Sequence, residues 1–238
     1  MKLDILAFGA HPDDIELGCS GTIAKEISLG KKVGIIDLTR GELGTRGSVE
    51  IRNAEAQQAA SILGISVREN LDMRDGFFVN DEQHQLKVIE MIRKYQPEIV
   101  LCNAVDDRHI DHGKGSKLVS DACFLSGLRQ IKTELSGIAQ EAWRPKVVYH
   151  YIQWKNLEPD FVVDITAFMD IKMDSILAYG SQFYNPDTNE PESPIASKNF
   201  LDSVKYRAQD LGRIIGSGYA EGFTVERYLA VNSLSDLQ

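Results

Sequence analysis

The amino-acid sequence predicts an α/β fold, with a Rossmann-like, mostly parallel sheet and helices on both faces. Short apolar runs alternate with longer helical patterns along the chain. That alternation is typical of parallel strands joined by crossover helices. A length of 238 residues suits one α/β domain. We therefore expect residues 1–238 to form a single domain.

The elements follow from apolar periodicity and from the residues that end each run. Buried strands are predicted by short apolar runs at residues 3–8, 33–38, 67–71, 99–102, 146–152, 161–165 and 223–231. Helices are predicted by helical spacing, several with glycine or proline at their ends, at residues 16–29, 49–63, 81–95, 112–128, 169–179 and 200–215. Residues 185–194 are rich in Pro, Asn, Asp and Glu and predict a surface loop.

Two polar motifs each follow an apolar strand. Ala10-His11-Pro12-Asp13-Asp14 follows the first strand, and His109-Ile110-Asp111-His112 comes after the strand at 99–102. Loops at the carboxyl ends of neighbouring parallel strands share one crevice. A catalytic zinc takes three protein ligands and leaves one position open for water. His11, Asp14 and His112 could be those ligands, which leaves Asp13 free to act as a base.

Each motif also has an ordinary structural interpretation. The first could be a turn that opens a helix, with Pro12 near the first helical position and Asp13 and Asp14 in the first turn. The second could be a solvated polar loop. Their joint occurrence favours a metal site, because three of the five histidines fall in these two motifs.

Composition and missing motifs argue against other classes of protein. A formal net charge of −9 argues against a nucleic-acid or anionic-membrane surface. No apolar run approaches a membrane span, and the amino terminus lacks the layout of a signal peptide. The three widely spaced cysteines suit reduced thiols in a cytoplasmic protein. Neither a G-x-G-x-x-G fingerprint nor a G-x-S-x-G elbow is present.

The two motifs, together with a third block, resemble the LmbE/PIG-L superfamily of zinc-dependent deacetylases. The third block is TRGELGTRG at residues 39–47, followed by RNAEA at 52–56. The resemblance covers essentially the whole chain and implies removal of the acetyl group from N-acetylglucosaminyl groups. Residues 181–184 and 218–223 are similar to the bacillithiol-biosynthesis branch, which implies N-acetylglucosaminyl-malate as the substrate.

With that reaction, the motif residues can be given roles. Asp13 would accept the proton of the attacking water. His109, as an imidazolium, would stabilise the oxyanion or donate a proton. Asp111 could orient His109 or a ligating histidine through a hydrogen bond. Fe(II) or Co(II) could occupy the zinc ligands, because histidine and carboxylate do not select zinc uniquely.

Arginines are the candidates for holding the acidic aglycone that the resemblance implies. Arg52 belongs to the family pattern, with a surface arginine on an amphipathic helix as the alternative, and Arg108 lies beside the second motif. Arg46 and Arg144 are further candidates. Tyr184 could stack on a sugar or pack in the core. We expect a small-molecule glycoside as partner, no nucleic acid and no membrane, and a homo-oligomer stays open.

The sequence leaves more than one function open. The first is a bacillithiol-type deacetylase. The second is a deacetylase or amidase that acts on another N-acetylglucosaminide or on a thiol conjugate. The third is a module that holds a metal or a sugar without turnover. Asp13 argues against the third, because a pure binding site needs no free carboxylate at the metal.

Overall fold

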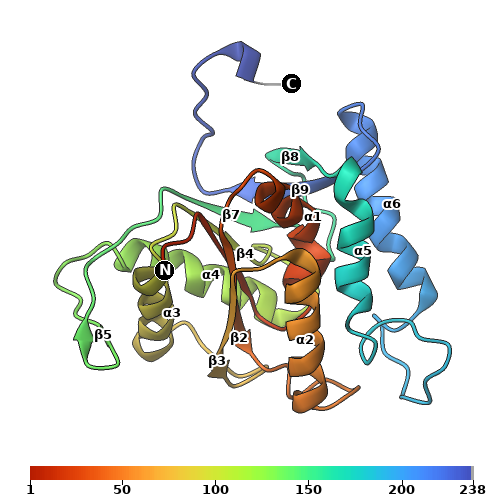
Figure 1. Ribbon diagram of the computed structural model, residues 1–238, viewed down its shortest axis with the longest axis horizontal. Coiled ribbons are helices and arrows are strands. Elements are labelled where there is room, and N and C mark those ends of the chain that lie inside the picture. Colours follow the sequence, from red (N-terminus) through yellow and green to blue (C-terminus); the bar gives the residue numbers. More distant parts are fainter. Residues whose placement is uncertain (237–238) are drawn as a thin grey trace.

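The computed structural model describes residues 1–236 and contains a seven-stranded sheet in the order β3-β2-β1-β4-β7-β9-β8 (Figure 1). The strands are β1 Ile5–Gly9, β2 Val33–Thr39, β3 Val67–Met73, β4 Ile99–Cys102, β7 Val147–Tyr151, β8 Phe161–Asp164 and β9 Ala220–Val225. Strands β3, β2, β1, β4 and β7 are parallel, whereas β9 runs antiparallel between β7 and β8. The predicted mostly parallel α/β sheet is confirmed.

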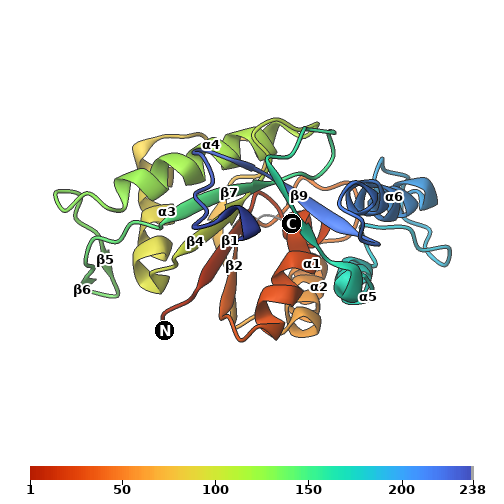
Figure 2. The ribbon, with the colours of Figure 1, turned by 90° about the horizontal axis from the view of Figure 1, so that it is seen from above.

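Helices cover both faces of this sheet, as the sequence predicts. They are α1 Asp14–Ser28, α2 Val49–Leu63, α3 Glu82–Tyr95, α4 Ile110–Leu125, α5 Met169–Leu177 and α6 Lys198–Ile214. Figure 2 shows α3 and α4 on one face of the parallel strands and α1, α2 and α5 on the other. Alternate residues of β1 point to opposite faces of the sheet. Leu6 and Phe8 pack with α3 and α4, and Ile5 and Ala7 pack with α1.

Local side-chain chemistry explains where several helices begin and end. Ser48, Asp81 and Ser197 each accept a hydrogen bond from the backbone N–H three residues later, at 3.3, 3.0 and 3.1 Å. Gly64 ends α2 in the left-handed conformation, with a φ of 74°. None of the helices in residues 1–236 combines the length and the apolar character that crossing a bilayer requires.

Some local expectations differ from the structure. Helix α1 begins at Asp14 with Asp13 as its N-cap at a φ of 106°, so Pro12 lies outside the helix. The strand expected at 223–231 is β9 at Ala220–Val225, because those are the positions that pair with β7 and β8. A short hairpin, β5 Glu134–Leu135 and β6 Ile138–Ala139, was not predicted. Both residues of its tight turn have positive φ, the turn geometry that suits two-residue hairpins.

The two polar motifs lie where the strand order reverses. Strand β1 is the middle one of the five parallel strands, with β2 and β3 on one side and β4 and β7 on the other. In an open α/β sheet, this reversal leaves a crevice at the carboxyl ends of the strands. The first motif follows β1 and the second comes after β4, so both reach the crevice. Loops after β2, β3 and β7 end at the same edge because these strands are parallel.

A buried ion pair makes hydrogen bonds to backbone groups of α1 on both sides of a break in this helix, beside the crevice. The break is at Cys19, whose φ of −147° and ψ of 16° are not helical. Lys172 of α5 donates to the backbone carbonyls of residues 16 and 17 at 3.0 and 2.8 Å, and to the Glu221 carboxylate at 2.7 Å. Glu221 of β9 accepts the backbone N–H groups of residues 21 and 22. The pair therefore ties α1 to α5 and β9.

Removing one partner of this pair should be costly. We expect Lys172→Met to lower the free energy of unfolding by about 3–5 kcal/mol, because Glu221 would stay buried without a cation. Urea unfolding measures the change. The double variant Lys172→Met, Glu221→Gln removes both charges and should lose less stability than Lys172→Met alone. A loss of less than about 1 kcal/mol in the single variant, a value typical of exposed pairs, would contradict a structural role for this contact.

Candidate metal and active site

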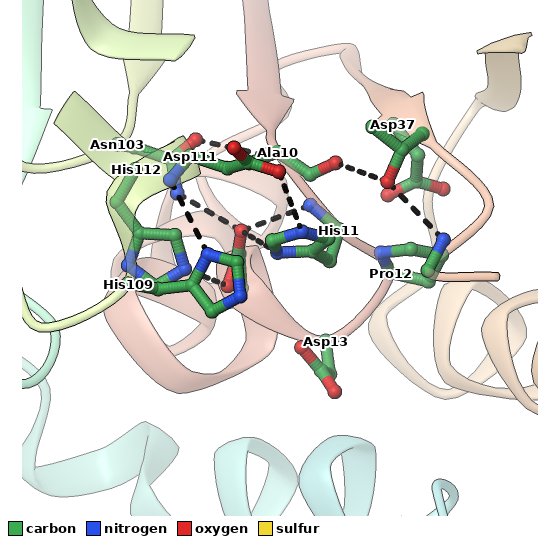
Figure 3. Close-up of polar contacts among 12 residues, drawn as sticks. Ala10, His11, Pro12, Asp13, Asp37, Asn103, His109, Asp111 and His112 are labelled. Carbon is green, nitrogen blue, oxygen red and sulfur yellow. Dashed lines mark hydrogen bonds and ion pairs between the residues drawn. The ribbon is translucent and has the colours of Figure 1, made fainter. Parts of the chain in front are cut away.

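Three imidazoles from the two polar motifs meet at the carboxyl ends of β1 and β4 (Figure 3). Nitrogen atoms of His11, His109 and His112 lie within 4.8 Å of one another, which is close enough to hold a metal ion. The His109 and His112 rings are stacked, with centroids 5.3 Å apart. His11 and His112 are 7% and 6% exposed, so the cluster is largely shielded from solvent.

The Asp14 carboxylate lies between two of these histidines. Its Oδ2 is 3.5 Å from Nδ1 of His11, and its Oδ1 is 3.0 Å from Nε2 of His112. Two neutral side chains fix the carboxylate: Asn103 donates to Oδ2 at 3.0 Å and Gln153 donates to Oδ1 at 2.8 Å. The structure thus brings together the three residues that the sequence proposed as metal ligands.

Further carboxylates hold each histidine from its other side. His11 Nε2 is 2.9 Å from Asp75 Oδ1 and 3.5 Å from Asp111 Oδ2. His112 Nδ1 is 2.7 Å from Asp107 Oδ2. These contacts leave Nδ1 of His11 and Nε2 of His112 facing the carboxylate between them. Ligating histidines are commonly fixed by such a partner, so this set of donors fits zinc, Fe(II) or Co(II).

The electrostatics of the cluster favour a cation. Burial lowers the pKa of His112, but the charge of Asp14 and hydrogen bonds to Asp107 and Asp14 raise it to about 9. Burial also opposes a charged His11, yet hydrogen bonds to three aspartates raise its pKa well above the ordinary value. The carboxylates therefore generate enough negative potential to stabilise positive charge in a buried place.

Asp13 is set apart from the histidine cluster (Figure 3). Its Oδ2 accepts a hydrogen bond from Arg52 Nη2 at 3.0 Å. Arg52 also donates to the carbonyls of Pro12 and Gly41, at 2.7 and 3.0 Å. A Cβ at position 41 would lie 2.1 Å from the Arg52 guanidinium, so this approach requires glycine. Burial raises the pKa of Asp13 to about 7 against the opposing charge of Arg52.

The contacts of His109 and Asp111 bear on the roles considered for them. His109 Nδ1 accepts the backbone N–H of Asp111 at 3.3 Å, so the proton of the neutral ring belongs on Nε2. Burial, followed by the charges of His11 and His112, lowers the pKa of His109. The structure therefore favours a neutral donor over the expected imidazolium. The Asp111 carboxylate contacts His11 and the N–H of Gly76, so of its two expected partners it faces the candidate histidine ligand.

A cavity of about 600 Å³ opens beside the cluster and reaches α6. The Arg108 guanidinium lines it, 4.5 Å from the centre of the Trp154 ring. Among residues 1–236, the lining also includes Arg46 but neither Tyr184 nor Arg144. Tyr184 is 39% exposed, and Arg144 instead lies over the Phe124 ring, 4.4 Å from its centre. The structure thus places two of the candidate substrate residues outside the cavity.

Sequence reasoning missed the residues that fix the proposed ligands: Asp75, Asn103, Asp107 and Gln153. Asp75 follows β3, Asn103 follows β4 directly and Gln153 follows β7. Their place after a parallel strand was the available signal. That signal is weak by itself, because most polar residues after these strands make other contacts.

Comparisons with known proteins agree with this geometry. The family model for PIG-L, described as GlcNAc-PI de-N-acetylase, matches residues 6–123, a span that contains both polar motifs and Arg52. Diacetylchitobiose deacetylase of Thermococcus kodakarensis is 28% identical over 230 residues, 92% of this chain and 81% of that protein. The crystal structure of the conserved protein TT1542 from Thermus thermophilus is 34% identical, with a TM-score of 0.85 over 97% of this chain and 98% of that one.

Another relative carries a different activity in its name. 4-Oxalmesaconate hydratase of Pseudomonas putida is 26% identical over 193 residues, 74% of this chain and 73% of that protein. Likeness alone therefore does not determine the reaction or the substrate, and none of these names refers to bacillithiol. The match to the family model and the likeness over almost the whole chain show that the protein belongs to the PIG-L/LmbE superfamily of deacetylases.

Proposed function

We propose that the protein is a metal-dependent hydrolase that removes the acetyl group from N-acetylglucosaminyl-malate in bacillithiol biosynthesis. The observation that carries the reaction is Asp13, a buried carboxylate that is held by Arg52 and lines the same cavity as His11, Asp14 and His112. The family match and the Thermococcus relative support an acetamide substrate. The free, buried cysteines suit the reducing cytoplasm that we propose as its location.

The residues divide the chemistry among them. His11, Asp14 and His112 would hold a divalent metal, which we propose to be zinc and which would supply Lewis acidity and lower the pKa of water. Asp13 accepts a proton from the water that attacks the acetamide carbon. His109 donates its Nε2 proton in a hydrogen bond to the carbonyl oxygen as negative charge develops there. Asp13 then passes its proton to the departing amine, and acetate is released.

Two arginines take different parts in this proposal. Arg52 uses both terminal nitrogens on Asp13 and on backbone carbonyls, so we assign it to holding the base in place. Arg108 is exposed, lines the cavity and stacks on Trp154, so we assign it to the acidic part of the substrate. Because Tyr184 is not part of the cavity lining, we do not assign it a contact with the sugar.

Acetate release from a small panel of glycosides tests the proposed function. Zinc-loaded protein should deacetylate N-acetylglucosaminyl-malate with a higher kcat/KM than N-acetylglucosamine or diacetylchitobiose. A preference for either neutral sugar would reject the bacillithiol assignment but keep the deacetylase. Stoichiometric metal with no acetate from any amide would instead favour a binding module or a hydratase.

A further inference from the structure

Arg46 is a buried arginine that makes no ion pair with any carboxylate in residues 1–236. It lies in the loop after β2, is 4% exposed and lines the cavity. Its Nε has no hydrogen-bond partner among the described residues, and Nη1 makes only long contacts, at 3.5 and 3.4 Å, to the carbonyls of Gln182 and Phe183. Burying a guanidinium without a partner is unfavourable. The position therefore calls for an acceptor that comes from outside the chain.

Other buried cations of this protein show what a purely structural role looks like. Arg52 and Lys172 are paired with Asp13 and Glu221, at 3.0 and 2.7 Å. Arg93 has no carboxylate, but it donates four hydrogen bonds of 2.8–3.0 Å to backbone carbonyls and a threonine hydroxyl. Arg46 has neither kind of partner, so it differs from the arginines that serve only the fold.

None of the acidic side chains that line the cavity within residues 1–236 is free to pair with Arg46. The acidic side chains that line the cavity are already engaged: Asp13 with Arg52, Asp14 and Asp75 with the histidines, and Glu221 with Lys172. Meanwhile the Arg46 backbone is anchored, because its carbonyl accepts a 2.8 Å hydrogen bond from Gln182 Nε2. The backbone at Arg46 is thus fixed before any ligand arrives, which limits the entropy lost on binding.

Stacked aromatic rings extend from Arg46 to Arg108, another arginine of the cavity that makes no ion pair among the described residues. Phe183, whose carbonyl Arg46 contacts, stacks on Phe200 at 6.1 Å between centroids. Phe200 stacks on Trp154 at 5.0 Å, and Trp154 carries the Arg108 guanidinium. The two arginines therefore lie at the two ends of one aromatic wall. An anion at that wall would meet guanidinium groups, which suit carboxylate and phosphate oxygens.

We propose that Arg46 binds an anionic group on the aglycone of the substrate and makes the enzyme selective for acidic glycosides over neutral ones. This inference rests on the proposed deacetylation of an N-acetylglucosaminyl substrate. The anion is a carboxylate or a phosphate.

Arg46→Gln tests the proposal on three substrates: N-acetylglucosaminyl-malate, an N-acetylglucosaminyl phosphodiester and the neutral methyl N-acetylglucosaminide. The KM for the acidic substrate should rise about 10- to 100-fold with little change in kcat, as expected for loss of a charged hydrogen bond. The neutral glycoside should be unaffected. The acidic substrate with the lower KM in the unaltered enzyme identifies the anion. Arg213→Gln, which changes an exposed arginine of α6 paired with Asp210, is the matched control and should alter neither.

The outcome is separable from that of the proposed function. Calorimetric binding of each acidic glycoside to Asp13→Asn, with and without Arg46→Gln, needs no turnover and should show the same loss of affinity. If the enzyme releases no acetate but this loss appears, the proposed reaction fails and the anion site stands. If acetate is released and Arg46→Gln weakens acidic and neutral substrates equally, or neither, the anion site is overturned. Thermal unfolding of Arg46→Gln confirms that the variant folds.

Discussion

Asp13→Asn should keep the bound metal and lose about 10²- to 10⁴-fold of its turnover, the usual contribution of a general base. An amide cannot accept the proton of the attacking water. The variant should fold, because Arg52 retains its hydrogen bonds to the carbonyls of Pro12 and Gly41. Metal content by elemental analysis and single-turnover acetate release provide the two measurements.

Asp14→Asn is the matched comparison, because it makes the same chemical change at the next residue. Asp14 lies between His11 and His112 and receives hydrogen bonds from Asn103 and Gln153. Replacing one of its oxygens with an amide NH2 group would place a donor opposite the donating group of Asn103 or Gln153. We expect that unfavourable contact to weaken the metal site. Loss of metal from Asp13→Asn, with retention in Asp14→Asn, would reverse the roles of the two residues.

The sequence is sufficient to predict the sheet and the place of the site, for a physical reason. Strands buried on both faces are continuous apolar runs, and the runs at β1, β2 and β4 are easily recognised. Parallel strands must present their carboxyl ends at one edge. Polar motifs that follow β1 and β4 therefore had to meet, although about a hundred residues separate them.

The partners of the site residues could not be predicted in the same way. Asp75 reaches His11 only because β3 ends beside the crevice, and Asp107 reaches His112 only because the loop before α4 folds back. Arg52 lies on a helical face that looks ordinary in sequence, but its guanidinium donates a hydrogen bond to Asp13. The absence of a partner at Arg46 is a property of three-dimensional packing. No residue type or spacing could have indicated it.

Substitution of a proposed metal ligand is the other change from which we expect a large loss of activity. His112→Ala should remove the metal and the deacetylase activity together, because its Nε2 is one of the donors that face Asp14. Asp107→Asn should lower metal affinity by about 10- to 100-fold, since Asp107 orients the same ring.

His109→Ala should retain the metal and lower kcat more than it changes KM, because its hydrogen bond matures in the transition state.

These variants also decide between the proposed donor set and a set of three imidazoles. His11, His109 and His112 lie within 4.8 Å of one another and could form a site of three imidazoles. Complete loss of metal in His109→Ala, with retention in Asp14→Asn, would establish that alternative. The hydrogen bonding argues against it. A metal on Nε2 of His109 would place the ring proton on Nδ1, where the Asp111 backbone N–H already points. Asp14, in contrast, faces both proposed histidine ligands through oxygens that can give up their present contacts to an ion.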